Sequence, residues 1–190
     1  MIRTSGKPSK FLAAVFAILI LSACSKETSR PSIESRLRET PTNDQTAPRR
    51  GYRAPDFVLR DISDRSIRLS DYRGKAVLIN FWATWCGPCE EEMPSLEALY
   101  ERNRNRDFVV LAVSSDSEGN EAVGPFSKTY HLSFPTLIDS NMEVNDIYQV
   151  RTIPASFLID RKGYIRDIVF GSTDWTAPEA QALVETLLSL

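Results

Sequence analysis

Residues 76–96 read AVLINFWATWCGPCEEEMPSL, and this stretch decides the fold. Its continuous apolar start predicts a strand over Lys75–Trp82 that is buried on both faces. The spacing of later apolar residues predicts a helix from Pro88 to about Arg102. Cys86 and Cys89 therefore lie where the strand turns into the helix, at a separation that allows a small disulfide ring. The helix dipole stabilises the thiolate of Cys86, so the motif predicts a reactive pair for thiol–disulfide exchange.

The amino terminus has the composition of a secretory signal. Three cations precede Phe11–Leu21, an unbroken run of eleven apolar residues that is short for a membrane span. The run continues into Leu21-Ser22-Ala23-Cys24, which resembles the bacterial lipobox. We therefore expect a lipoprotein signal peptide at 1–23 and lipidation of Cys24, with an ordinary signal cut near Ala23 or an uncleaved anchor as alternatives. Each of these places the rest of the chain outside the cytoplasm, and the lipid would anchor it to the bacterial membrane facing the periplasm.

Residues 24–53 differ in composition from the rest of the chain. They hold three prolines, several serines and threonines, and few large apolar residues. Such a segment cannot bury enough apolar surface to offset its chain entropy, so we expect a disordered tether. Residues 54–190 contain 13 basic and 21 acidic residues, a net charge of −8. An acidic domain argues against nucleic acid as a partner, because nucleic-acid binding uses a basic face.

Residues 54–190 predict a single α/β domain. Alternating strands and helices followed by an antiparallel hairpin indicate a mixed sheet within a three-layer sandwich. Residues 57–59 and 66–69 flank a polar turn and predict an amino-terminal β-hairpin. Further strands are expected at 107–113, 134–139, 155–160 and 164–170, and further helices at 119–131, 143–148 and 177–190.

Residues 81–89 resemble the active-site segment of thioredoxin-like proteins. The segments APDF at 54–57, LSDYRGK at 69–75 and IPASFLID at 153–160 narrow the resemblance to the TlpA/ResA branch of the redoxin group. Members of this branch are extracytoplasmic and tethered to a membrane. The resemblance implies a thioredoxin-like fold with an added amino-terminal β-hairpin and a strand–helix insertion before Pro154.

The resemblance also implies the residues of the site. It keeps Cys86 and Cys89 as the catalytic pair and places a cis peptide bond at Ile153-Pro154 beside them. Only about 5–6% of X-Pro bonds in folded proteins are cis, so composition alone gives little support to either site. On that ground Phe134-Pro135 is an equal candidate for the cis bond. We favour Pro154 because it alone precedes a strand, a turn and a terminal strand in the order that the family shows. The expected substrate-binding residues are Trp85, Gly87, Pro88, Ile153 and Pro154.

The pair between the cysteines points to the direction of the reaction. Gly-Pro is the pair found in reducing thioredoxins, whose potential is about −270 mV. We therefore expect a disulfide reductase acting on disulfide-bearing client proteins, with the Cys86–Cys89 disulfide as its redox centre and no cofactor. The resemblance implies apocytochrome c as a frequent client and a membrane thiol-reductant donor of the CcdA/DsbD type. We expect a monomer.

Four alternatives to a reductase stay open. The cysteine pair could form an inert structural disulfide. A structural zinc site needs four ligands, and beyond this pair the chain offers His131 and Cys24 without a second C-x-x-C motif, so no metal is expected. A thiol peroxidase of the peroxiredoxin type would carry threonine three residues before the reactive cysteine, where this chain has Ala83. A redox scaffold would bind a partner without turnover.

The proton transfer is also open. In many cytoplasmic thioredoxins a buried aspartate, at the position matching Asn80, assists proton transfer from the second cysteine, and asparagine cannot titrate. Glu92, three residues after Cys89, is the nearest carboxyl in the sequence that could replace it. An acid near a helix start is favoured by the dipole alone, and on that ground Glu92 is expected outside the core site. His131 is expected to be a surface or packing residue.

Overall fold

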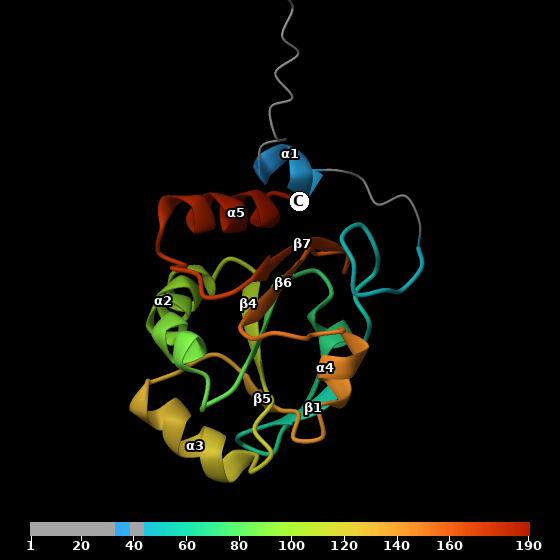
Figure 1. Ribbon diagram of the computed structural model, residues 1–190. Coiled ribbons are helices and arrows are strands. Elements are labelled where there is room, and N and C mark those ends of the chain that lie inside the picture. Colours follow the sequence, from blue (N-terminus) through green and yellow to red (C-terminus); the bar gives the residue numbers. More distant parts are fainter. Residues whose placement is uncertain (1–32, 39–43) are drawn as a thin grey trace, which may run out of the picture. The chain divides into compact units, whose positions relative to one another are not determined.

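The computed structural model describes residues 33–38 and 44–190 (Figure 1). Its strands are β1 (Val58–Asp61), β2 (Ser66–Arg68), β3 (Ala76–Trp82), β4 (Phe108–Ser114), β5 (Thr136–Ile138), β6 (Ala155–Ile159) and β7 (Ile165–Phe170). They form one sheet in the order β2-β1-β5-β4-β3-β6-β7. β4 is parallel to both β3 and β5, and the other neighbours are antiparallel, so the sheet is mixed as expected.

Helices cover both faces of this sheet (Figure 1). They are α1 (Ile33–Arg38), the 3-10 helix η1 (Leu69–Tyr72), α2 (Gly87–Asn103), α3 (Asn120–Thr129), α4 (Glu143–Ile147) and α5 (Pro178–Leu188). Side chains alternate along β3, so Leu78 and Trp82 pack with residues of α2, α3 and α5, whereas Ile79 and Phe81 pack on the opposite face with residues of α4. The expected three-layer, thioredoxin-like α/β sandwich is confirmed.

Both predicted additions to the thioredoxin core are present. β1 and β2 form an antiparallel hairpin, and β1 also pairs with β5, so the hairpin extends the main sheet. β5 and α4 form the strand–helix insertion ahead of Pro154. Among the described residues the cis peptide bond is Ile153-Pro154, as expected, and Phe134-Pro135 is not cis.

The expected disorder of residues 24–53 is wrong for the described part of this segment. α1 contacts α5 and β7, and Leu37 is fully buried in the core. Further along, the backbone N–H of Gly51 donates to the carbonyl of Ile165 at 2.8 Å, and the N–H of Ile165 donates to the carbonyl of Tyr52 at 2.9 Å. The described part of this segment is ordered by tertiary contacts. Its few apolar side chains are buried against elements far along the chain, and its backbone forms hydrogen bonds with them. The predicted signal peptide 1–23 and Cys24 lie outside the described residues.

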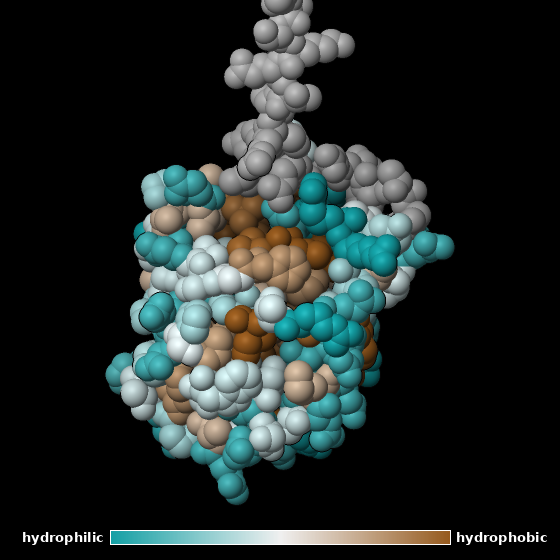
Figure 2. All heavy atoms as spheres, viewed as in Figure 1, coloured by the Kyte–Doolittle hydropathy of each residue, from teal (hydrophilic) through white to brown (hydrophobic). Residues whose placement is uncertain are grey.

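The surface of the described domain is mixed in polarity. Figure 2 shows polar residues over much of the visible face and a group of apolar residues in its middle, where α5 and β7 lie in Figure 1. Of the helices that the structure describes, none has the length and apolar character required to cross a membrane.

Candidate active site

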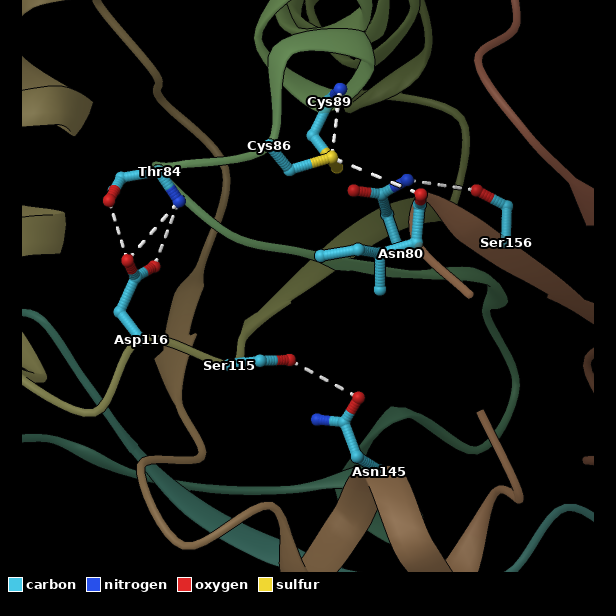
Figure 3. Close-up of a disulfide and its surroundings, with 9 residues drawn as sticks. Asn80, Thr84, Cys86, Cys89, Ser115, Asp116, Asn145 and Ser156 are labelled. Carbon is cyan, nitrogen blue, oxygen red and sulfur yellow. Dashed lines mark hydrogen bonds between the residues drawn. A yellow bond between two sulfur atoms is a disulfide. The ribbon is translucent and has the colours of Figure 1, made fainter. Parts of the chain in front are cut away.

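The two cysteines occupy the turn from β3 into α2 (Figure 3). Cys86 is the N-cap residue of α2, and its Sγ accepts a hydrogen bond from the backbone N–H of Cys89 at 3.3 Å. Pro88 lies in the first turn, where its missing N–H costs no helical hydrogen bond. The two sulfurs are joined in a disulfide, with Cα atoms 5.2 Å apart. In the reduced enzyme, the backbone donor and the helix dipole would both stabilise negative charge on the Cys86 sulfur.

The two cysteines differ in accessibility. Cys86 keeps 7% of its surface exposed, whereas Cys89 has 0%. A disulfide in another protein can therefore approach Cys86 but not Cys89. Cys89 is placed to attack Cys86 from the interior, which is the arrangement that thiol–disulfide exchange through a mixed disulfide requires.

The predicted substrate-binding residues surround Cys86. The carbonyl oxygen of Ile153 lies 3.9 Å from Cys86 Sγ, which brings the loop containing the cis bond against the reactive sulfur. Ile153 is half-buried and Pro154 is buried. The exposed members of the predicted set are Trp85, Gly87 and Pro88. The exposed fraction of Trp85 is 69%, so a large apolar side chain lies free beside the sulfur.

A buried acid, Glu92, follows Cys89 by one helical turn. Its side chain is 2% exposed and accepts a hydrogen bond from Nε1 of Trp175. Burial raises the pKa of Glu92 to about 7, and the neighbouring Trp175 and Asn80 side chains oppose this shift only in part. The structure does not support the expectation that Glu92 is merely an acid favoured by the helix dipole, because its carboxyl lies in the core.

Asn80 lies in the same buried region. Its Nδ2 donates to Oγ of Ser156 at 3.0 Å (Figure 3). Within the described part of the chain, Asn80 Oδ1 and Glu92 Oε2 are buried and have no hydrogen-bond partner. A buried polar atom without a hydrogen-bond partner destabilises the folded state, so its presence indicates a role other than stability. Because asparagine cannot titrate, Glu92 is the titratable group of this pair.

Sequence analysis missed Asp116, which is fully buried beside the loop that leads into Cys86. Its carboxylate accepts hydrogen bonds from the N–H of Thr84 at 3.0 Å and from the hydroxyl of Thr84 at 2.5 Å (Figure 3). It also accepts one from the hydroxyl of Ser114 at 2.6 Å. These contacts fix the loop. A signal was available, because residues 114–116 form a polar run at the carboxyl end of a parallel strand, where functional residues of α/β sheets gather.

The remaining candidate, His131, is exposed just after the end of α3. This agrees with the expected surface histidine. Across residues 33–38 and 44–190, no group of three His, Cys, Asp or Glu side chains is placed to hold a metal ion.

The geometry can now be set beside known proteins. A sequence profile described as the AhpC/TSA family matches residues 50–168. The chain belongs to this family. The thiol-disulfide oxidoreductase ResA of Geobacillus kaustophilus is 43% identical over 129 residues, which cover 68% of this chain and 74% of that protein. The thioredoxin-like protein YneN of Bacillus subtilis is 39% identical over 137 residues, which cover 72% and 80% of the two chains.

Solved structures agree with this placement. A thiol-disulfide oxidoreductase from Bacteroides fragilis superimposes with a TM-score of 0.62 at 26% identity, covering 71% of this chain and 98% of that one. StoA from Bacillus subtilis gives a TM-score of 0.59 at 28% identity, covering 70% and 96%. Together with the paired cysteines, these similarities confirm a ResA-like thiol:disulfide oxidoreductase.

Proposed function

We propose that this oxidoreductase reduces disulfides in client proteins outside the cytoplasm. The observation that carries the proposal is the position of the Cys86 sulfur, accessible at the start of α2 and beside the Ile153 carbonyl, with Cys89 buried behind it. The Gly-Pro pair between the cysteines supports reduction as the direction, since reducing thioredoxins carry the same pair.

The reaction has two exchange steps. The Cys86 thiolate attacks one sulfur of a client disulfide, the client S–S bond breaks, and the other client sulfur leaves as a thiolate that takes up a proton. Cys89 then loses its proton and attacks Cys86 Sγ, so the mixed disulfide breaks and the second client sulfur leaves. The client gains two electrons and two protons, and the enzyme keeps the Cys86–Cys89 disulfide.

Glu92 is proposed to accept the proton of Cys89 in the second step. Both side chains are buried and lie one turn apart on α2. A general base works best when its pKa lies near the operating pH, and the pKa of Glu92 is about 7. This assignment fills the role that Asn80 cannot perform.

The cellular setting of the proposal rests on the sequence. Lipid on Cys24 would hold the enzyme at the membrane on the periplasmic side. Each turnover consumes one dithiol, so electrons must come from a donor, for which we propose a membrane thiol-reductant protein of the CcdA/DsbD type. Apocytochrome c is the proposed client, and the enzyme is proposed to act as a monomer.

Insulin reduction with dithiothreitol tests the proposal. The wild-type protein should accelerate precipitation of the insulin B chain, and Cys86→Ser should abolish this activity. Cys89→Ser should complete the first step and accumulate a mixed disulfide on Cys86 that mass spectrometry identifies. Cys24→Ser removes the third cysteine and serves as the matched control. Full activity in Cys86→Ser, or rapid turnover of peroxide by a wild type that leaves insulin intact, would contradict the proposal.

A further inference from the structure

The end of the domain opposite the cysteines, which we call the basic end, carries exposed cations. β3 enters the sheet at this end and reaches the cysteine loop after seven residues, or about 23 Å of extended strand. At its start, the N–H of Gly74 donates to the carbonyl of Arg161 at 2.9 Å, so the turn between β6 and β7 lies beside it. Within residues 33–38 and 44–190, the exposed cations of this end without an ion pair are Arg38, Arg49, Arg73, Lys75 and Lys162.

The segment that precedes β1 brings two of these cations to the basic end. Arg49 lies two residues before Gly51, whose N–H donates to the carbonyl of Ile165 at the start of β7. Arg38 ends α1, which contacts β7 and α5. Figure 1 shows α1 near the C terminus, at the end of the domain away from α3.

Acids at the basic end do not cancel this charge. Asp107 lies 3.3 Å from Arg161, and Asp44 lies 2.8 Å from Arg53, so these acids already have arginine partners. The exposed acid Asp71 can offset one of the unpaired cations. The surplus at this end is therefore positive.

The cysteine end has the opposite sign. Glu90 and Glu91 are exposed directly after Cys89, and residues 54–190 as a whole carry a net charge of −8. The positive surplus is thus confined to one end of an acidic domain. An anionic surface attracts the basic end and repels the remainder, so it favours a single orientation of the domain.

We infer that the basic end docks on the anionic phospholipid headgroups of the membrane with Cys86 facing away from the bilayer, which rests on the proposed lipid anchor at Cys24. Eight residues separate Cys24 from Ile33, and an extended chain of that length spans about 30 Å at most. That reach lets the basic end come within a Debye length of the headgroups, about 8 Å at physiological salt, where Lys and Arg are attracted to anionic lipid. Clients and the thiol donor would then meet Cys86 from the aqueous side.

Acylation of lysine side chains tests this orientation. The full-length oxidised protein, purified from bacterial membranes, is reconstituted into vesicles of phosphatidylcholine alone or of three parts phosphatidylcholine to one part phosphatidylglycerol. A membrane-impermeant amine reagent is added, and peptide mass spectrometry gives the rates at Lys75 and Lys162. Lys128 is the internal control, because it is also exposed but lies on α3 beside Ser63, outside the basic end.

In the anionic vesicles the rates at Lys75 and Lys162 should fall at least about threefold relative to Lys128, because the negative surface potential keeps nearby amines protonated and the headgroups shield them. About 0.5 M salt, at which the Debye length is near 4 Å, should remove the difference.

Two double variants separate the basic end from total charge. Arg49→Gln with Arg73→Gln removes two cations of the basic end and should lessen the slowing at Lys162. Arg60→Gln with Arg68→Gln removes the same charge from the β1–β2 hairpin and should preserve it. Arg60 lies at the level of the cysteine end, because it pairs with Ile138 of β5, which in turn pairs with the last residue of β4.

Unchanged relative rates in the two kinds of vesicle, or equal slowing at all three lysines, would overturn the docking and leave the reductase function and the anchor in place. Insulin reduction by the same vesicles is measured in parallel, and its absence would count against the reductase function alone. Release of the protein from phosphatidylcholine vesicles would overturn the anchor, and the docking with it.

Discussion

Replacing Glu92 by glutamine tests whether the buried carboxyl carries a proton. The side chain is 2% exposed and the pKa of Glu92 is about 7, against an ordinary value of 4.5. Between these two pH values the folded protein keeps a proton that the unfolded chain has released. Stability therefore decreases as pH rises through this window, because the unfolded state binds fewer protons than the folded one.

The size of the effect follows from the same two values. Each tenfold change in proton affinity is worth 1.36 kcal/mol, so a pKa raised from 4.5 to about 7 corresponds to about 3 kcal/mol. Glutamine keeps an oxygen that can accept the hydrogen bond from Trp175 and has no charge to desolvate. The advantage of Glu92→Gln over wild type should therefore grow by up to about 3 kcal/mol between pH 4.5 and pH 8.

Urea unfolding of the oxidised proteins at intervals from pH 4.5 to 8 measures this difference. Glu91→Gln is the matched control, since it removes an acid from the neighbouring, exposed position of the same helix. The control should show a difference below about 0.5 kcal/mol at every pH. A stability difference between Glu92→Gln and wild type that stays constant across the range would refute the raised pKa.

Three other substitutions and one control variant test the packing and the site. Leu37→Ala should lower the free energy of unfolding by about 3 kcal/mol, because Leu37 is fully buried. An unchanged thermal midpoint would show that α1 does not pack on the rest of the domain. Asp116→Asn should lower the free energy of unfolding by about 1–3 kcal/mol and slow insulin reduction, since an amide cannot accept hydrogen bonds from both Thr84 and Ser114 as the carboxylate does. Wild-type stability in urea together with wild-type activity would contradict this role of Asp116. Arg166→Met should cost about 3 kcal/mol in urea unfolding, because it removes the arginine that lies 2.6 Å from buried Asp160 and leaves that carboxylate with backbone N–H donors but no opposite charge in contact. Arg60→Met breaks an exposed pair with Asp64 and should cost less than about 1 kcal/mol, so equal losses in the two arginine variants would count against the buried pair.

Local patterns in the sequence accounted for most of the fold. The strand before Cys86, the helix after it and the insertion at 143–148 were predicted to within a few residues, because each has its own apolar periodicity. The cis bond at Ile153-Pro154 was predicted through the family resemblance, since bare composition did not separate it from Phe134-Pro135.

What escaped prediction depends on partners far along the chain. Glu92 stands on the same helical stripe as Cys89 and Leu96, so its inward direction was readable from the spacing. Its partner Trp175 is 83 residues away, and no local pattern links the two. The burial of Leu37 was not predicted for the same reason. A single leucine in a polar segment predicts burial only when the surface that it contacts on α5 is known.

If Glu92 accepts the proton of Cys89 as proposed, the buried amide of Asn80 would be compatible with that role. Among the described residues Asn80 Oδ1 has no partner, so it would accept a hydrogen bond if protonated Glu92 turned its carboxyl toward it, while Asn80 Nδ2 donates to Ser156. If the amide turns over, its NH₂ can donate to ionised Glu92 and its oxygen can accept from the Ser156 hydroxyl. Asn80 can therefore pair with either charge state of Glu92, whereas an aspartate there would repel the ionised form. On the proposed mechanism the proton carrier of this interior lies on the helix rather than on the strand, and Asn80 would suit both states through which Glu92 passes when it takes the proton of Cys89.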